Sequence, residues 1–516
     1  MTPRNIFRLA LAIAAAGYLA WSQLAPHHAA ARKPAAGAQE PPPPPRKLGS
    51  LAFQPCTLST AMAPTTVAAQ CTRMDVPEDR AHPGGRTISL AIAWVPSRDD
   101  EAAPDPVFML AGGPGQSALE SYPGVAPAFS ETRKQRDVIL VDQRGTGGSN
   151  PLSCKGIGNA SGDQQVPDAL DDPATLRRLT AECRDALAKK ADLRFYTTTD
   201  AIADLDAVRA AIGADKIDLV GISYGTRVAQ QYARTYAAHT RAVVLDSVAP
   251  NELIFGNDFA RNLEDALALQ FKLCANEPAC AKKLGEPKAN LDDLLAKLKA
   301  NPQPVDYRDP QTGAFAHGTL TRADVAILAR MYAYQPIALA TLPIALADAL
   351  GGHYAALKAQ ASALNGNLGD SMAEGMQLSV ICAEDADGLK VAPEMASSVL
   401  GNQLVQALQE QCAAWPHGTR PADFHQPLVS DLPILVLEGE FDPVTPPRYG
   451  KQVTQHLHNG RMLLLRGQGH NVIGVGCMPK LMAHFFETAN AKALDASCLD
   501  ALPRTPPFTS YSGWEP

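Results

Sequence analysis

One short stretch, residues 216–236, constrains the fold of this chain more than any other. Residues 216–220 are rich in apolar side chains, as in a buried strand, and residues 226–236 contain no Gly or Pro and can form a helix. Between them, Gly221-Ile222-Ser223-Tyr224-Gly225 fits the G-x-S-x-G pattern of a serine at a sharp strand-to-helix turn. Glycine on each side removes collisions with the neighbouring strand and helix. An incidental turn serine is the alternative, because the pattern alone is common.

Segments typical of strands and helices alternate on both sides of this turn. Residues 200–212 carry apolar side chains at helical spacing. Apolar runs typical of strands occur at 87–95, 106–110, 137–141, 242–245, 433–437 and 461–465. This alternation predicts an α/β fold with a mostly parallel central sheet and helices on both of its faces.

The composition changes near residue 251, where alanine, leucine and lysine become dominant up to about residue 425. Helical periodicity is found there at 263–274, 291–298, 322–334 and 337–350. We therefore expect a helical cap over residues 251–425, inserted between two parts of the core at 49–250 and 426–516. A chain of 516 residues is long enough for a large domain with such an insertion.

The N-terminus has the order of a secretory signal peptide. Two arginines precede an apolar run at 9–21, and small residues follow around 29–31, which predicts a signal peptide over 1–31. An uncleaved anchor is the alternative, because the apolar stretch at 6–24 is nearly long enough to span a bilayer. Residues 32–48 contain five consecutive prolines and predict a stiff linker.

The chain has ten cysteines, and in an exported protein these are expected to be oxidised. They fall into near-neighbour couples, for which pairing in chain order is the simplest connectivity, although sequence alone does not fix it. The couples are Cys56 with Cys71, Cys154 with Cys183, Cys274 with Cys280, Cys382 with Cys412, and Cys477 with Cys498. No C-x-x-C motif is present, and no histidine lies at ligand spacing from a couple, so no metal or cofactor is expected.

Two further side chains lie after predicted strands and complete a catalytic pattern with Ser223. Functional groups in parallel sheets gather outside the carboxyl ends of the strands. Asp442 follows the strand at 433–437, and His470 follows the strand at 461–465 in a loop with two glycines. In the order Ser, Asp, His, the serine would attack a carbonyl, the histidine would take and return the proton, and the aspartate would hold the imidazole tautomer. Asp246 and Glu440 are the alternative acids.

Acyl transfer also needs an oxyanion hole, two backbone N–H groups aimed at the developing negative charge. Tyr224, the residue after the candidate nucleophile, is expected to supply one. The second is expected from Gly112-Gly113-Pro114-Gly115, with Gly113 as the donor, since Pro114 has no N–H. An ordinary Gly-Pro turn is the alternative interpretation of this segment.

These segments together resemble the proline iminopeptidase and tripeptidyl aminopeptidase group of α/β-hydrolases. The resemblance lies in residues 112–115, the run from Asp142 to Ser149 (DQRGTGGS), residues 221–225, and the Asp442 and His470 segments. The exported form with a segment such as 477–498 is similar to the secreted tripeptidyl aminopeptidases. Ala111 departs from the histidine that proline iminopeptidases usually carry there, which weakens an inference of strict proline specificity.

The resemblance implies release of short units or single residues from peptide N-termini. It also implies that acidic groups of the cap bind the free α-ammonium, and Glu384, within the acidic segment 382–387, is the candidate. A solvated acidic loop is the alternative. Arg144 is expected to order the loop beneath the oxyanion segment. An esterase or amidase acting on small acyl substrates stays open, because fold and triad do not fix the substrate.

The expected partner is a peptide or another small acyl substrate. A net charge of −7 gives no indication of nucleic-acid binding. No stable membrane partner is expected unless the N-terminal segment is an uncleaved anchor. The predicted location is the periplasm or the extracellular space.

Overall fold

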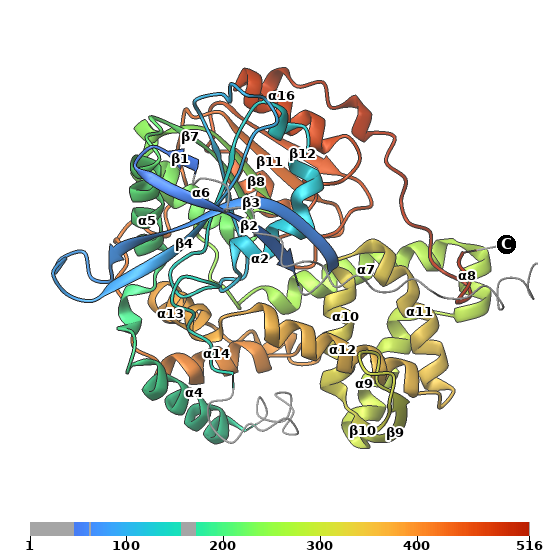
Figure 1. The fold of residues 1–516 in the computed structure, drawn as a ribbon. Helices are drawn as coiled ribbons and strands as arrows, with labels where there is room; N and C mark the ends of the chain where they lie inside the picture. Colours follow the sequence, from blue (N-terminus) through green and yellow to red (C-terminus); the bar gives the residue numbers. More distant parts are fainter. Residues whose placement is uncertain (1–45, 61–62, 156–171, 515–516) are drawn as a thin grey trace, which may run out of the picture. The chain divides into compact units, whose positions relative to one another are not determined.

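The computed structural model describes residues 46–60, 63–155 and 172–514 (Figure 1). The predicted signal peptide or anchor, and the predicted linker up to residue 45, lie outside the described residues. Arg46–Leu48, assigned above to the linker, form strand β1 and pair antiparallel with β2 (Leu51–Thr60). No helix of the described residues is both long and apolar enough to cross a bilayer.

A ten-stranded sheet organises the described residues, in the order β1-β2-β3-β4-β6-β5-β7-β8-β11-β12. Strands β1 to β4 are antiparallel, and β4 is antiparallel to β6. From β6 to β12 every neighbouring pair is parallel. The remaining strands are β3 (Ala63–Pro77), β4 (Thr87–Val95), β5 (Val107–Leu110), β6 (Val138–Val141), β7 (Ile217–Ile222), β8 (Thr240–Asp246), β11 (Ile434–Gly439) and β12 (Gly460–Leu465). Each strand predicted from the sequence is therefore confirmed.

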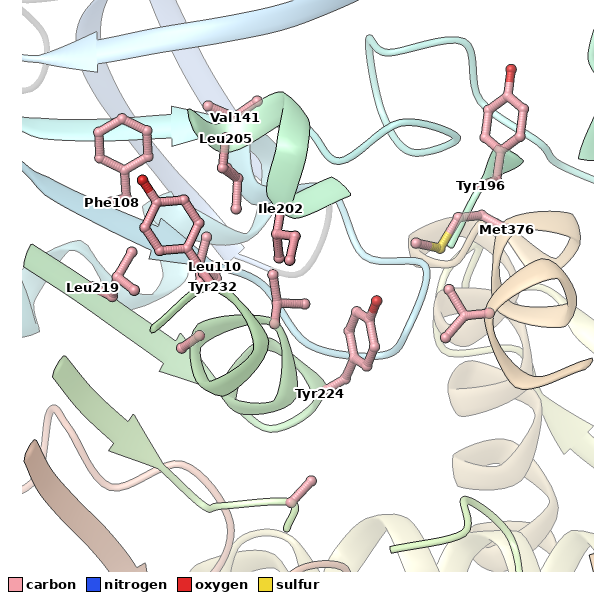
Figure 2. Close-up of a cluster of buried hydrophobic side chains, with 14 of the residues drawn as sticks. Phe108, Leu110, Val141, Tyr196, Ile202, Leu205, Leu219, Tyr224, Tyr232 and Met376 are labelled. Atoms are coloured by element: carbon pink, nitrogen blue, oxygen red, sulfur yellow. The ribbon is translucent and has the colours of Figure 1, made fainter. Parts of the chain in front are cut away.

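Both faces of the parallel part of the sheet are buried from β6 to β11. Successive side chains of a strand point to opposite faces. In β5, Phe108 and Leu110 belong to one hydrophobic cluster, and Val107 and Met109 belong to another. The first cluster includes side chains of α5 (Thr198–Ala211), α6 (Tyr224–Thr235) and α15 (Pro447–Thr454). Figure 2 shows part of it, with strand residues packed against Ile202 and Leu205 of α5. The second includes α2 (Ala118–Val125) and α16 (Met478–Thr488).

The chain between β8 and β11 is mostly helical, and it divides into two layers. Helices α7 and α9 to α12 share a hydrophobic core of their own, and α8 packs in a small cluster with α7 and α11. Helices α13 and α14 instead add their apolar side chains to the first core cluster of the sheet. The helices are α7 (Phe259–Asn276), α8 (Pro278–Leu284), α9 (Pro287–Ala300), α10 (Arg322–Ala333), α11 (Pro336–Leu350), α12 (Ala355–Ser371), α13 (Glu374–Glu384) and α14 (Gln403–Ala414).

An antiparallel hairpin of β9 (Gln303–Arg308) and β10 (Phe315–Leu320) also lies in this insertion, beside α9 and α12 in Figure 1. The sequence analysis did not predict it. Most of its side chains are exposed or half-buried, so it lacks the apolar run by which the strands of the main sheet are found.

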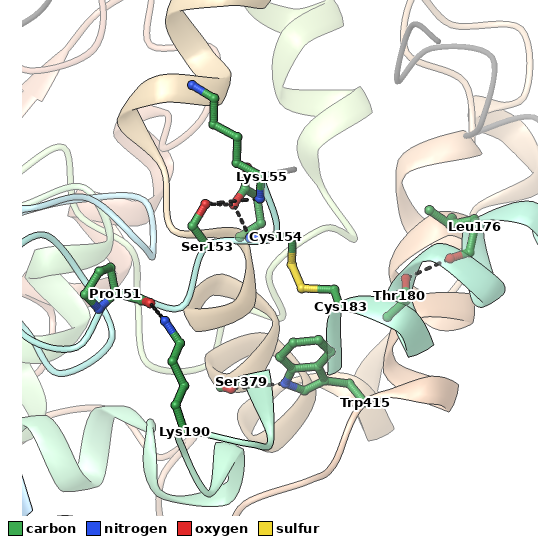
Figure 3. Close-up of a disulfide and its surroundings, with 11 residues drawn as sticks. Pro151, Ser153, Cys154, Lys155, Leu176, Thr180, Cys183, Lys190, Ser379 and Trp415 are labelled. Atoms are coloured by element: carbon green, nitrogen blue, oxygen red, sulfur yellow. Dashed lines mark hydrogen bonds between the residues drawn. A yellow bond between two sulfur atoms is a disulfide. The ribbon is translucent and has the colours of Figure 1, made fainter. Parts of the chain in front are cut away.

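Five disulfides join the cysteines in the predicted chain order. Cys154–Cys183 ties the loop after β6 to α4 (Pro173–Leu187), close to Trp415 (Figure 3). Cys382–Cys412 joins α13 to α14. These two bridges hold α4, α13 and α14 in place beside the sheet.

Candidate active site

Ser223 occupies a strained turn between β7 and α6. Its backbone has φ 56° and ψ −120°, a region that non-glycine residues rarely adopt. A Cβ on Gly221 would lie 2.4 Å from the Gly225 carbonyl oxygen, and one on Gly225 would lie 2.2 Å from the Leu110 carbonyl oxygen in β5. Both glycines are therefore required by close backbone contacts, with the helix in one case and with a strand in the other. The Ser223 N–H donates to the carbonyl oxygen of Asp246 at 2.9 Å.

Asp442 and His470 lie together at the ends of β11 and β12. Asp442 Oδ2 is 2.7 Å from His470 Nδ1, and their side chains are 0% and 3% exposed. Asp442 Oδ1 accepts hydrogen bonds from the N–H groups of Val444 and Thr445, each at 2.8 Å. The Thr445 hydroxyl, not predicted from the sequence, donates to Asp442 Oδ2 at 3.0 Å. Since Nδ1 faces the carboxylate, Nε2 is the nitrogen left for a nucleophile.

The loops that carry these two side chains touch through glycines. A Cβ on Gly439 would lie 1.8 Å from the Gly469 carbonyl oxygen, so only glycine allows the two loops to approach this closely. On the side of the insertion, Tyr334 follows α10, and its carbonyl oxygen accepts the His470 N–H at 3.0 Å. The Tyr334 ring packs edge-on against the imidazole, with centroids 5.0 Å apart. Tyr334 carries no sequence signal, because it ends a helix that lacks any motif.

The other two candidate acids do different things. The Asp246 carboxylate accepts the N–H groups of Val472 and Ile473, and burial raises the pKa of Asp246 to about 6. Glu440 accepts the Gly467 N–H and pairs with Arg504. Of the three acids, the structure brings Asp442 alone into hydrogen-bond distance of the His470 ring.

Ser223 and His470 lie on either side of β8, the strand between β7 and β11. Asp246, the last residue of β8, pairs with Ile222 on one side and Leu437 on the other. Within the described residues, no hydrogen bond joins the Ser223 hydroxyl to the imidazole. Such contacts are often long in free enzymes and tighten when substrate binds.

The expected oxyanion segment follows β5 and lies against the candidate nucleophile. A Cβ on Gly112 would be 3.2 Å from Ser223 Cβ, and Gly113 has φ 105°, where glycine is favoured. In the part of the chain that the structure describes, neither the Gly113 N–H nor the Tyr224 N–H donates to a protein acceptor. Tyr224 also begins α6, so the positive end of the helix dipole lies beside Ser223.

The run from Asp142 to Ser149 holds in place the residues that follow the oxyanion segment 112–115. Asp142 accepts the Ser117 hydroxyl at 2.6 Å and the Leu119 N–H at 3.1 Å, which fixes the start of α2. Burial raises the pKa of Asp142. Arg144 is fully buried and donates to both carboxylate oxygens of Asp204 in α5, at 2.6 and 2.7 Å. These contacts agree with the structural function expected for Arg144.

Glu384, the candidate for binding a substrate amine, is the last residue of α13 and its side chain is 0% exposed. It accepts the Thr198 N–H at 2.6 Å and the Thr198 hydroxyl at 3.0 Å. Burial raises the pKa of Glu384 to about 8, although Arg227, 3.8 Å away, opposes the shift. Thr198 in turn bonds the Tyr224 hydroxyl at 2.7 Å.

Glu384 therefore lies beneath the site and does not present its carboxylate to a bound peptide in this arrangement. Its neighbour Asp385 is also buried and pairs with Arg227 at 2.9 Å. Asp387 is largely exposed and pairs with Arg420. The alternative of a solvated acidic loop thus describes Asp387 but not Glu384 or Asp385.

Comparisons with known proteins agree with this architecture. Residues 105–476 match the family described as the alpha/beta hydrolase fold. The chain is 25% identical to a tripeptidyl aminopeptidase of Streptomyces lividans, over 83% of each chain. It is 26% identical to the serine protease Hip1 of Mycobacterium tuberculosis, over 88% of this chain and 92% of that protein.

A solved proline iminopeptidase of Mycobacterium smegmatis is also similar, at 16% identity and a TM-score of 0.39, over 81% of this chain and 98% of the other. The resemblance inferred from the glycine, aspartate and histidine motifs is confirmed. Since the family match spans most of the chain, from before β5 to beyond His470, this protein belongs to the α/β-hydrolase fold family.

Proposed function

We propose that this protein is an exported serine peptidase that removes short units or single residues from peptide N-termini. Ser223 is the nucleophile, His470 the general base and acid, and Asp442 the group that orients the imidazole. The observation that carries the proposal is the buried 2.7 Å contact between Asp442 Oδ2 and His470 Nδ1 at the sheet edge where Ser223 sits in its strained turn.

In the proposed reaction the Ser223 hydroxyl attacks the scissile carbonyl carbon while His470 Nε2 accepts the hydroxyl proton. The negative charge that forms on the carbonyl oxygen accepts hydrogen bonds from the N–H groups of Gly113 and Tyr224. His470 then gives its proton to the leaving amine, the C–N bond breaks, and an acyl-enzyme forms. Water repeats the sequence in the second half, releasing the acid and regenerating the Ser223 hydroxyl.

Action at chain ends is supported by contacts between the insertion and the site. Tyr334 packs on His470, and the Ala373 N–H, just before α13, donates to the Gly115 carbonyl oxygen at 3.0 Å. Two separate parts of the insertion thus cover the histidine and the oxyanion segment, which favours a chain end over an internal peptide segment. The names of the two curated relatives, an aminopeptidase and a serine protease, point the same way.

A carboxylesterase or amidase acting on small acyl substrates is the second candidate. The observation that favours it is the burial of Glu384, since an aminopeptidase needs a carboxylate that can reach the substrate ammonium. Fold and triad serve both reactions equally.

One set of assays separates the two. Purified protein is offered peptide anilides with free and with blocked N-termini, and a short-chain p-nitrophenyl ester, with Ser223→Ala as control. The proposal predicts cleavage of the free anilides well above the blocked ones. Cleavage of esters alone, or equal cleavage of free and blocked peptides, would reject the aminopeptidase in favour of the second candidate.

Export is supported by the five disulfides, which persist in oxidising compartments, and by the order of residues at the N-terminus. Alkylation of denatured protein without reductant should leave its mass unchanged, whereas reduction should expose all ten cysteines. Labelling without reductant of protein from its native host would contradict the exported state.

A further inference from the structure

Four consecutive residues at the end of β8, Asp246 to Ala249, contact the segments that carry Ser223, Asp442 and His470. The Ser247 N–H donates to the Leu437 carbonyl oxygen in β11 at 2.9 Å, and the Val248 N–H donates to Glu438 at 3.3 Å. The Ala249 N–H donates to the Thr226 hydroxyl in α6 at 2.9 Å. The segment thus joins α6, the helix that follows Ser223, to β11, the strand that leads to Asp442.

The same segment holds the three amides that directly follow His470. The Ser247 hydroxyl accepts the Asn471 N–H at 2.8 Å. The Asp246 carboxylate accepts the Val472 N–H through both oxygens, at 2.9 and 3.1 Å, and the Ile473 N–H at 3.3 Å. Asn471 has φ 66°, a conformation that costs free energy and persists only where its surroundings enforce it. The hydrogen bonds to Asp246 and Ser247 hold Asn471 in this conformation.

On its other side Asp246 holds the nucleophile. Its carbonyl oxygen accepts the Ser223 N–H at 2.9 Å. Asp246 therefore holds both the turn that carries Ser223 and the loop that carries His470. The distance between the Ser223 hydroxyl and His470 Nε2 is therefore set by Asp246 and by the strand pairing around it, in the absence of a direct hydrogen bond between the two side chains.

We propose that Asp246, assisted by Ser247, is a positioning residue that aligns His470 with Ser223 for proton transfer without touching the substrate. This inference rests on the proposed function. Displacing a reacting group by about 1 Å can cost about 10²-fold in rate, so the anchor of the loop that carries His470 can control turnover.

The charges around Asp246 suit this function. The titratable groups that face it are His470, Asp442 and Glu438. Burial raises the pKa of Glu438 well above its ordinary value, which favours the uncharged form of this carboxyl. The pKa of Asp246, about 6, leaves it ionised above that pH. Its negative charge then favours the imidazolium that forms during turnover.

The test compares Asp246→Ala and Asp246→Asn with Asp324→Asn, a matched control. Asp324 is equally buried, also accepts a backbone N–H, and lies at the far end of α10 from Tyr334. We expect kcat to fall by about 10²-fold in Asp246→Ala with KM nearly unchanged. We expect a loss of about tenfold in Asp246→Asn, whose amide oxygen can still accept one N–H. Asp324→Asn should retain wild-type kcat.

The pH profile adds a readout that simple destabilisation would not move. Without the charge of Asp246 the imidazolium is less favoured, so the acidic limb of kcat/KM should shift to lower pH in Asp246→Asn. Ser247→Ala removes the acceptor of the Asn471 N–H at little structural cost. If Asp246→Ala does not fold, this variant tests the positioning function in its place. It should lower kcat by about three- to tenfold.

All variants are assayed on a substrate that the wild type cleaves, beside Ser223→Ala. If folded Asp246 variants and Ser247→Ala keep kcat within about twofold of wild type, or lose activity in KM alone, the positioning function is overturned. Activity that survives in Ser223→Ala instead overturns the proposed function itself. The two failures are therefore distinguishable.

Discussion

Among the buried acidic clusters of the described residues, two lie near Ser223 in the fold and differ in what their basic side chain can do. In the first, His470 pairs with Asp442, Asp246 lies close to both, and Glu438 lies beside the two aspartates. In the second, Glu384 and Asp385 face Arg227 of α6. An imidazole can take and give a proton near neutral pH, whereas a guanidinium is always charged. The first cluster is suited to proton transfer and the second to holding structure.

The contacts of the two clusters differ in the same way. Asp442 and Asp246 accept hydrogen bonds from backbone amides of loops at the sheet edge, which orient them without adding charge. Arg227 and Asp385 instead join α6 of the core to α13 of the insertion. Buried acids beside a base are thus insufficient to identify a catalytic centre. The base must also be held so that it can reach a nucleophile.

The comparison is tested most strongly by removing the base of the first cluster. His470→Ala should lower kcat by about 10⁴-fold or more, because the proton of Ser223 then has no acceptor. The measurement is steady-state hydrolysis of the best anilide or ester, with circular dichroism to verify folding. His425→Ala is the matched control, since His425 lies in the second cluster, 3.7 Å from Asp385; it should keep most of the activity.

Asp442→Asn should reduce kcat by about 10⁴-fold, because an amide facing Nδ1 favours the wrong imidazole tautomer. KM should change little, since Asp442 does not touch the substrate. Glu440→Gln alters the alternative acid in the same loop and should have a small effect. A larger loss in Glu440→Gln than in Asp442→Asn would contradict the assignment of the acid.

Breaking the second cluster should affect stability and leave chemistry nearly intact. Asp385→Asn leaves Arg227 without its closest counter-charge, and losing one partner of a buried pair costs about 3–5 kcal/mol. The exposed pair of Asp387 with Arg420 offers a control, where Asp387→Asn should cost less than about 1 kcal/mol. Denaturant unfolding measures both. A selective loss of kcat in folded Asp385→Asn would assign the second cluster to catalysis.

The last prediction concerns the pH dependence of stability. The pKa of Glu384 rises on folding from 4.5 to about 8, so the folded state binds its proton more tightly than the unfolded state. The stability that this provides is complete below about pH 4.5 and is lost as pH rises through 8. Glu384→Gln cannot ionise and should therefore lose less stability than wild type between pH 5 and pH 9. Parallel curves for the two proteins would contradict the buried position of Glu384.

Much of the fold could be predicted because its signals are local. The parallel strands of the main sheet are short apolar runs, and Ser223, Asp442 and His470 each follow one of them. The glycines beside Ser223 are required by backbone contacts that the G-x-S-x-G pattern already implies. The cysteine couples are also local, since their members lie 6 to 30 residues apart.

The remaining features depend on contacts between distant residues. Asp246 holds the Val472 N–H across a separation of 226 residues, and no local pattern announces this. Glu384 lies in an acidic segment that suggests a surface, but its carboxylate is buried and accepts the Thr198 N–H at the start of α5. Tyr334 reaches His470 only because the insertion folds over the sheet edge. Sequence reasoning therefore finds the catalytic residues at the strand ends. It misses the distant residues that cover these side chains and align them.

The central claim is that Ser223 reacts covalently with help from His470 and Asp442. Treatment with a fluorophosphonate, followed by intact-mass analysis and peptide mapping, tests it most directly. We predict one adduct, on Ser223, with hydrolytic activity falling in proportion to labelling and with labelling greatly slowed in His470→Ala. An adduct on another residue, or full activity after complete labelling of Ser223, would contradict the account.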